Sequence, residues 1–253
     1  MAGSNQQFAK GFSLTEVLLA VGTLAVGMLF IAGVFPVSVH LITISSERTI
    51  AATVADEAFA KIQLYGFLPA TDVNWVAGQS PFEYVASTQP PTVCFAYPST
   101  NDPNSKYWWS AICRRIDLND VQVTVFVSRK AGVVSQYWAR DPLNLPMLTR
   151  IAWPVPVYIS VYAAPSSRPD ERSIVDLVPG GIDERTFIND GSTIVDGYTG
   201  QIYRVLERYT PPNDYVIRLD RDWQGGTTVW VVPPPVGGGR YPCIAVYQKV
   251  VSF

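Results

Sequence analysis

KGFSLTEVLLAVGTLAVGMLFIAGVFPVSVHLITI, residues Lys10–Ile44, combines a short polar head with a long apolar run. From Val17 to Ile44 the chain contains no Asp, Glu, Lys or Arg, and His40 is the only strongly polar side chain. A helix needs about 20 apolar residues to cross a hydrocarbon core of about 30 Å. We therefore expect a transmembrane helix here, with the lone carboxylate of Glu16 at its head.

The length of this run separates a spanning helix from a secretory signal peptide. The apolar core of a signal peptide is normally about 7–15 residues long and ends at a small-residue cleavage site. The run that follows Glu16 exceeds that length. An unpaired carboxylate at the edge of such a segment costs about 2.5 kcal/mol or more if it enters hydrocarbon, so Glu16 requires a partner.

The residues around Glu16 carry a resemblance to a known family. Lys10, Gly11, Phe12 and Glu16 stand at a spacing that resembles the processing signal of type IV prepilins and of type II secretion pseudopilins. The resemblance implies that a prepilin peptidase removes a leader, residues 1–11, by cutting between Gly11 and Phe12, and that it methylates the new amine of Phe12. It also implies that Glu16, the fifth residue of the mature chain, neutralises that amine during filament assembly.

The helix is predicted to continue beyond the membrane. In the segment after Ile44, apolar residues recur at spacings of three and four, which is the period of an amphipathic helix: Ile50, Ala51, Val54, Ala55, Ala58, Phe59, Ile62 and Tyr65. Glu57 and Lys61 form an i,i+4 pair in the favourable order, and Gly66 and Pro69 indicate a stop. We expect one helix over residues 12–66, with residues 12–44 as the transmembrane and assembly part and residues 45–66 as the amphipathic part.

A proline interrupts the apolar half of this helix. Pro36 follows Gly33, and a proline inside a helix removes one backbone hydrogen bond and bends the axis. Pilins often carry a proline in this part of the helix at a bend. The sequence leaves two readings open: a functional bend, or a membrane-helix proline with no special role.

The remaining chain, residues 67–253, has the composition of a β domain. Short alternating runs rich in β-branched residues predict strands at Val121–Ser128, Val157–Tyr162, Ile202–Tyr209, Tyr215–Leu219, Thr227–Val232 and Cys243–Val251. The expected fold class is α+β and pilin-like, with a long N-terminal helix packed on a predominantly antiparallel β domain. A proline-rich tract, Leu143–Tyr158, either divides this domain into two lobes or forms a loop across one sandwich.

Composition excludes several function classes. The chain has 19 basic and 21 acidic residues and no dense basic cluster, so it lacks the electrostatics of a nucleic-acid-binding protein. Its single histidine, His40, lies in the membrane segment, so the soluble part lacks the residues for a Ser-His-Asp triad or a histidine zinc site. We expect no enzymatic activity and no cofactor.

Acidic residues gather in three places, Asp117–Gln122, Asp183–Gly191 and Arg218–Trp223. We interpret the last two as solvated turns in preference to a glycosidase carboxylate pair. All three offer oxygen ligands for calcium, which some pseudopilins bind, but no full EF-hand loop is present and the ligands of a metal stay unknown. The tryptophans Trp108, Trp109 and Trp223 are expected to pack in the core and not on a sugar or another subunit.

Three cysteines, Cys94, Cys113 and Cys243, lie outside the inner membrane if the pilin topology holds, where disulfides persist. Cys94 and Cys113 flank an aromatic segment and are the preferred disulfide pair. Cys243 then remains inside a strand as a buried small hydrophobe. Three free buried thiols are the alternative, and the sequence leaves both open.

Two function classes follow. The first is a minor pilin or pseudopilin, anchored in the bacterial inner membrane with a periplasmic soluble domain, whose partners are the prepilin peptidase and other subunits of a type IV pilus or type II secretion filament. The second is a single-pass anchored β domain that acts as an adhesin, receptor or carbohydrate-binding module. The cleavage motif favours the first class, and the large soluble domain favours a minor or tip subunit. The choice between pilus and secretion filament stays open.

Overall fold

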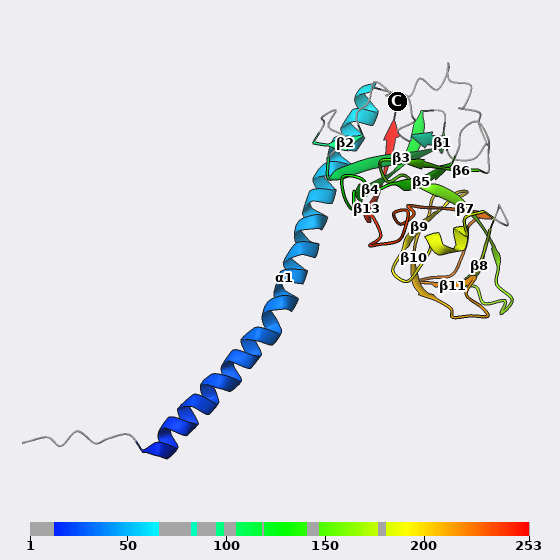
Figure 1. The fold of residues 1–253 in the computed structure, drawn as a ribbon. Coiled ribbons are helices and arrows are strands. Elements are labelled where there is room, and N and C mark those ends of the chain that lie inside the picture. Colours follow the sequence, from blue (N-terminus) through cyan, green and yellow to red (C-terminus); the bar gives the residue numbers. More distant parts are fainter. Residues whose placement is uncertain are drawn as a thin grey trace, which may run out of the picture. The chain divides into compact units, whose positions relative to one another are not determined.

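The computed structural model describes residues 13–65, 82–84, 95–98, 105–117, 119–140, 147–176 and 181–252. The described chain consists of one long N-terminal helix followed by antiparallel β structure, which confirms the expected α+β class (Figure 1). It forms two compact units, Met1–Glu47 and Arg48–Phe253. The first contains the apolar part of the helix, and the second contains the rest of the helix and all the described strands.

Helix α1 spans Leu14–Tyr65 and is continuous through Pro36. It begins after Ser13, whose carbonyl accepts hydrogen bonds from the backbone N–H groups of Glu16 and Val17 at 3.0 and 3.2 Å. It ends directly before Gly66, the residue predicted to stop it. The single predicted helix is therefore confirmed, with boundaries shifted by one or two residues.

The C-terminal part of α1 is amphipathic, as predicted. Six residues of the predicted apolar face are buried, each at most 7% exposed: Ala51, Val54, Ala55, Ala58, Phe59 and Ile62. They share one hydrophobic core with residues of the sheet described next. On the polar side, Lys61 Nζ lies 2.7 Å from Glu57 Oε1, so the predicted ion pair forms. Burial of the apolar face, more than intrinsic propensity, stabilises this part of the helix.

An open antiparallel sheet covers this face of α1. Its long strands are β3 (Tyr107–Arg115), β4 (Asp120–Arg129) and β13 (Cys243–Ser252), in the order β3-β4-β13. Two short strands, β1 (Phe82–Tyr84) and β2 (Ala96–Tyr97), both pair with β3. The last strand of the chain therefore lies directly against β4, with Val251 opposite Val121.

Alternation along β4 places two different sets of side chains on the two faces of the sheet. Val121, Val123, Val125 and Val127 belong to the core shared with α1 and are at most 2% exposed. Phe126, which points to the other face, belongs to a second cluster together with residues from the strands described below. Because successive side chains of a strand point to opposite faces, β4 has two buried faces and forms a central layer.

Six further strands form a closed antiparallel barrel, in the order β10-β11-β8-β7-β12-β9. Their bounds are β7 (Val157–Ala163), β8 (Glu171–Val175), β9 (Thr193–Asp196), β10 (Ile202–Arg208), β11 (Val216–Leu219) and β12 (Thr228–Val231). The barrel has its own core of aliphatic and aromatic side chains, which includes Ile159, Ile194, Tyr203 and Ile217 at 0% exposure. Closure removes the exposed strand edges that an open sheet of these short strands would have.

A buried ion pair attaches the hairpin of β5 (Tyr137–Arg140) and β6 (Leu148–Ile151) to the 3-10 helix η1 (Glu184–Phe187). Arg140 donates from Nη1 to Glu184 Oε1 at 2.6 Å and from Nη2 to Glu184 Oε2 at 2.9 Å, so the contact is bidentate. Both side chains are at most 3% exposed. Removing one member of such a buried pair typically costs about 3–5 kcal/mol, because the other charge loses its partner.

The β part has two main cores, which answers the question left open by the proline-rich tract. Trp153 stacks on Trp108 at 5.4 Å between ring centroids and packs against the core of the open sheet, whereas Val157 belongs to the barrel core. Leu148, earlier in the tract, also packs against the barrel core, so the tract contacts both cores. A third, smaller cluster of Ile112, Phe126, Val195, Trp230 and Val232 joins the sheet to the barrel.

Candidate functional site: an apolar helix headed by Glu16

The N-terminal part of α1 presents apolar side chains on every side. Exposed fractions reach 78% for Leu14, 73% for Leu29 and 71% for Phe30. Among the described residues, α1 is the one helix long and apolar enough to span a membrane, and its most apolar window is 0% buried within the chain. A helix that is hydrophobic all round requires an apolar environment, which the described residues of its own unit do not supply. The segment is therefore able to anchor the protein in a membrane.

The few polar groups in this segment are largely satisfied within the helix. The hydroxyls of Thr23, Ser38 and Thr43 donate to backbone carbonyls three or four residues earlier, at 2.9, 3.1 and 2.9 Å. Each hydroxyl therefore needs no partner from outside the helix. His40 is exposed on the helix surface.

Glu16 lies in the first turn of α1, and its side chain is exposed. A carboxylate in this position interacts favourably with the helix dipole, because the first backbone N–H groups carry partial positive charge. No cation within residues 13–65 or the other described ranges forms an ion pair with Glu16. The expected partner, the amine of Phe12, lies outside the described residues, and so does Gly11 on the other side of the predicted cleavage point.

The predicted disulfide is only half described. Cys113 is buried in β3 at 1% exposure, in the core shared with α1, and burial raises the pKa of its thiol. Cys94 lies outside the described residues, so its pairing with Cys113 stays a prediction. Cys243 lies at the start of β13, and burial raises the pKa of its thiol to about 12. Both described thiols are therefore protonated at neutral pH and weakly nucleophilic.

The acidic residues of the three clusters make local hydrogen bonds and ion pairs that stabilise the fold. Asp183 caps η1 by accepting from the backbone N–H of Arg185 at 3.1 Å, and it also pairs with the Arg185 guanidinium at 2.8 Å. Asp220 accepts from the backbone N–H of Arg204 at 3.0 Å, and Asp120 accepts from the Ser252 hydroxyl at 2.6 Å. In the part of the chain that the structure describes, no three His, Cys, Asp or Glu side chains gather in a way that could hold a metal ion.

The three tryptophans that the sequence singled out pack as expected. Trp108 and Trp109 are 8% and 2% exposed in the core between α1 and the open sheet. Trp223 is partly buried against the barrel core, with its ring centroid 4.6 Å from that of Tyr203. Their main contacts are with the core, so they do not form an aromatic platform on the surface.

In comparisons with known proteins, no protein-family model, no curated protein and no solved structure matches this chain.

Proposed function

We propose that this protein is a minor pilin or pseudopilin, a structural subunit of a type IV pilus or type II secretion filament, processed between Gly11 and Phe12. One observation carries the proposal: the motif Lys10–Glu16 stands at the head of a helix that is apolar on every side and is not buried by the described residues of its own compact unit. Such a helix serves membrane insertion before assembly and helix packing in a filament afterwards, since both environments are apolar.

The chemistry of Glu16 supports assembly in particular. Cleavage after Gly11 would create a cationic amine at Phe12, and burying an isolated cation among apolar helices is unfavourable unless a carboxylate pairs with it. Glu16 is the only acidic residue between the start of α1 and Ile44. A neighbouring subunit's amine would therefore find one charged partner on this surface, which fixes the axial position of one subunit relative to the next.

The second part of the helix supports a pilin-like architecture. Its apolar face is covered by an antiparallel sheet, so a folded domain is connected to the apolar segment without a linker. The barrel is an addition to the helix and its covering sheet, and it makes the soluble domain large. A large soluble domain favours a low-abundance or tip subunit over the repeating major subunit. Prepilin peptidase, other pilin subunits and the inner membrane are the proposed partners.

A membrane-anchored binding module is the second candidate. The observation that favours it is the closed barrel with its own core, because the barrel contributes no residue to the core that covers α1. In this alternative the soluble part acts as an adhesin, receptor or carbohydrate-binding domain and does not polymerise. Leader processing separates the two candidates, since a simple anchor does not need a cut between Gly11 and Phe12.

The test is the mass of the N-terminal peptide after expression in a host with an active prepilin peptidase. We expect a mature chain that begins at Phe12 and carries one methyl group. In Gly11→Leu the leader should stay attached, because a side chain at this position blocks close approach of the protease to the backbone. The matched control, Gly3→Leu, changes another leader glycine and should be cleaved normally. An intact Met1 terminus on the unaltered protein from this host would contradict the proposal.

A further inference from the structure

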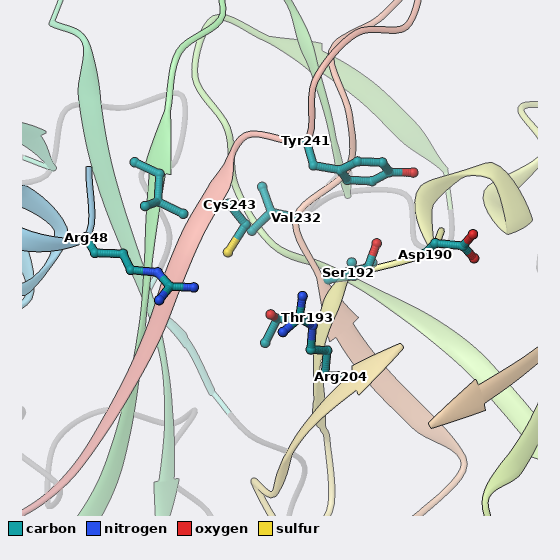
Figure 2. A pocket seen from close by; sticks show the side chains of 11 residues that line it. Arg48, Asp190, Ser192, Thr193, Arg204, Val232, Tyr241 and Cys243 are labelled. Carbon is teal, nitrogen blue, oxygen red and sulfur yellow. The ribbon is translucent and has the colours of Figure 1, made fainter. Parts of the chain in front are cut away.

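A pocket of about 240 Å³ lies within the unit Arg48–Phe253 (Figure 2). Its aliphatic lining residues are Val231, Val232 and Ile244, from the end of β12 and the start of β13, and the two valines are only 1% exposed because their side chains pack in the neighbouring cores. The turn and strand start Gly191–Thr193 also line the pocket, and β9, which begins at Thr193, pairs with β12. Pockets that hold drug-sized molecules are typically about 300–1,000 Å³, so this one suits a smaller molecule.

Two arginines supply the charge of the pocket. Arg48 enters from α1 and Arg204 from β10, and both guanidinium groups point into the hollow (Figure 2). Within the described ranges, neither guanidinium forms an ion pair or a hydrogen bond with a protein carboxylate. Sequence reasoning missed this pair, because nothing in a single sequence brings residues 48 and 204 together.

The other ionisable groups of the pocket do not neutralise these arginines. The Asp190 carboxylate accepts from the backbone N–H of Arg208 at 2.6 Å and lies at the far end of the pocket (Figure 2). Burial raises the pKa of the Cys243 thiol and of the Tyr241 phenol to about 12, so both groups are uncharged at neutral pH. The end of the pocket near Arg48 and Arg204 therefore has an unbalanced positive charge.

We propose that this pocket binds a small organic acid, with a carboxylate or phosphate group held between the guanidinium groups of Arg48 and Arg204. Guanidinium groups present planar sets of donors that match either oxyanion, and hydrogen bonds between charged partners are about twice as strong as neutral ones. The hydroxyl of Thr193, at the start of β9, supplies a further donor (Figure 2). The volume of about 240 Å³ leaves room for a small carbon skeleton beside the oxyanion.

This site is independent of the proposed filament function. Barrel strands and β13 supply five of its lining residues, Thr193, Arg204, Val231, Cys243 and Ile244, and no lining residue lies in the apolar part of α1. A failure of leader cleavage would leave this inference intact, and a failure of acid binding would leave the filament proposal intact.

The experiment is isothermal titration of the full chain in a non-ionic detergent and a phosphate-free buffer of low ionic strength. Four probes are used: D-glucuronate, glucose 6-phosphate, glucose and inorganic phosphate. The three sugars share one ring and differ at a single carbon, so they distinguish carboxylate, phosphate and neutral hydroxyl. We expect glucuronate, glucose 6-phosphate or both to bind at least about tenfold more tightly than glucose, and added salt to weaken that binding.

Arginine variants locate the binding. Arg48→Gln and Arg204→Gln should each weaken the binding of the acidic sugar by about tenfold or more, because each removes a charged donor. The matched control, Arg218→Gln, removes an exposed arginine of β11 that does not line the pocket, and affinity should be unchanged. Unfolding curves of the three variants establish that each is folded, and the two pocket variants test the site independently.

Three results would overturn the inference. The first is the absence of any binding heat from both acidic sugars and from inorganic phosphate. The second is equal affinity for glucose and for the acidic sugars, which would make the anion irrelevant. The third is acid binding that is unchanged in both folded pocket variants, which would place the bound acid elsewhere on the protein.

Discussion

At the scale of single residues, the proposed functions depend on three charged side chains, Glu16, Arg48 and Arg204. Glu16 could be selected from the sequence, because a carboxylate at the head of an apolar run needs a reason to be there. Arg48 and Arg204 could not, because arginines are common on solvated surfaces and their shared pocket exists only in the folded chain. A functional charged residue can therefore be identified from the sequence when its neighbours in the chain are apolar. It cannot be identified when its role depends on a residue that is distant in the sequence.

Glu16→Gln tests the role of that carboxylate. We expect membrane insertion and leader cleavage to continue, because neither needs a charge at this position. Incorporation into a filament should fall by a factor of about a hundred or more, since an unpaired buried ammonium costs about 3–5 kcal/mol. The measurement is cross-linking of the variant to the major subunit in the assembled filament.

The matched control for Glu16 is Glu57→Gln in the amphipathic part of α1. Glu57 pairs with Lys61 at 2.7 Å within the same helix and lies outside the apolar segment that would pack in a filament. Its loss should leave incorporation unchanged. If Glu16→Gln incorporates as well as the control, Glu16 is not the assembly partner of the terminal amine.

At the scale of elements, α1 was the easiest to predict and the short strands were the hardest. The helical period over Ile50–Ile62 extends for several turns, so a pattern could be recognised. Strands β8 (ERSIV) and β9 (TIVD) have only five and four residues and begin or end with an acidic side chain. Those acids are buried because they have hydrogen-bond partners: Asp196 accepts from the backbone N–H of Gly226 at 2.8 Å. Short polar-ended strands carry too little alternation to be identified.

Val54→Ala tests whether packing of α1 on the sheet stabilises the fold. Val54 is 0% exposed in the core that α1 shares with the open sheet. The smaller side chain should leave a cavity and lower the free energy of unfolding by about 2 kcal/mol. The measurement is chemical unfolding of the full chain in a non-ionic detergent, followed by tryptophan fluorescence.

Thr53→Ala is the control for this change, because Thr53 is the exposed neighbour on the same turn. Its hydroxyl donates only to the carbonyl of Thr49 within the helix, at 3.3 Å, so stability should change by less than about 0.5 kcal/mol. Equal unfolding free energies for the two variants would show that this helix face does not stabilise the domain.

At the scale of the whole molecule, the sequence predicted a helix with antiparallel β structure but not the division of that structure into a sheet and a closed barrel. All six strand segments that it identified are strands, at Asp120–Arg129, Val157–Ala163, Ile202–Arg208, Val216–Leu219, Thr228–Val231 and Cys243–Ser252. The partners of these strands depend on contacts between distant residues, such as Val125 with Tyr247. A single sequence does not show which distant residues pair. The positions of these strands could therefore be predicted, but their order in the sheet and the barrel could not.

We expect the stability of the molecule to fall at acid pH, in part because Glu171 becomes protonated. This side chain is 2% exposed at the start of β8, and hydrogen bonds from the hydroxyls of Ser166 and Tyr209 hold the pKa of its carboxyl below the usual value. A pKa that is lower in the folded than in the unfolded chain stabilises the fold above the unfolded value, near 4, and this stabilisation is lost as pH falls through the folded value. We therefore expect Glu171→Gln to reduce stability at pH 7 by about 2 kcal/mol.

The measurement is the unfolding free energy between pH 7 and pH 3 for the unaltered protein, for Glu171→Gln and for Glu207→Gln. The curve of Glu171→Gln should be flatter below pH 4.5 than that of the unaltered protein. Glu207 is an exposed carboxylate of β10, 3.7 Å from the guanidinium of Arg218, and its variant should follow the unaltered curve. If the unfolding free energies of all three proteins changed with pH in the same way, Glu171 would not be a cause of the loss of stability in acid.

The position of β13 after the barrel strands in the sequence has a consequence for biosynthesis. All six barrel strands lie between β4 and β13 in the sequence, and a ribosome makes them before β13. The barrel can therefore complete its own core while the sheet beside α1 still lacks its last strand. Until Val251 reaches its place opposite Val121, β4 has an open edge able to pair with another nascent chain. A premature stop codon directly before Cys243 would make that temporary state permanent and yield an aggregating product with an intact barrel.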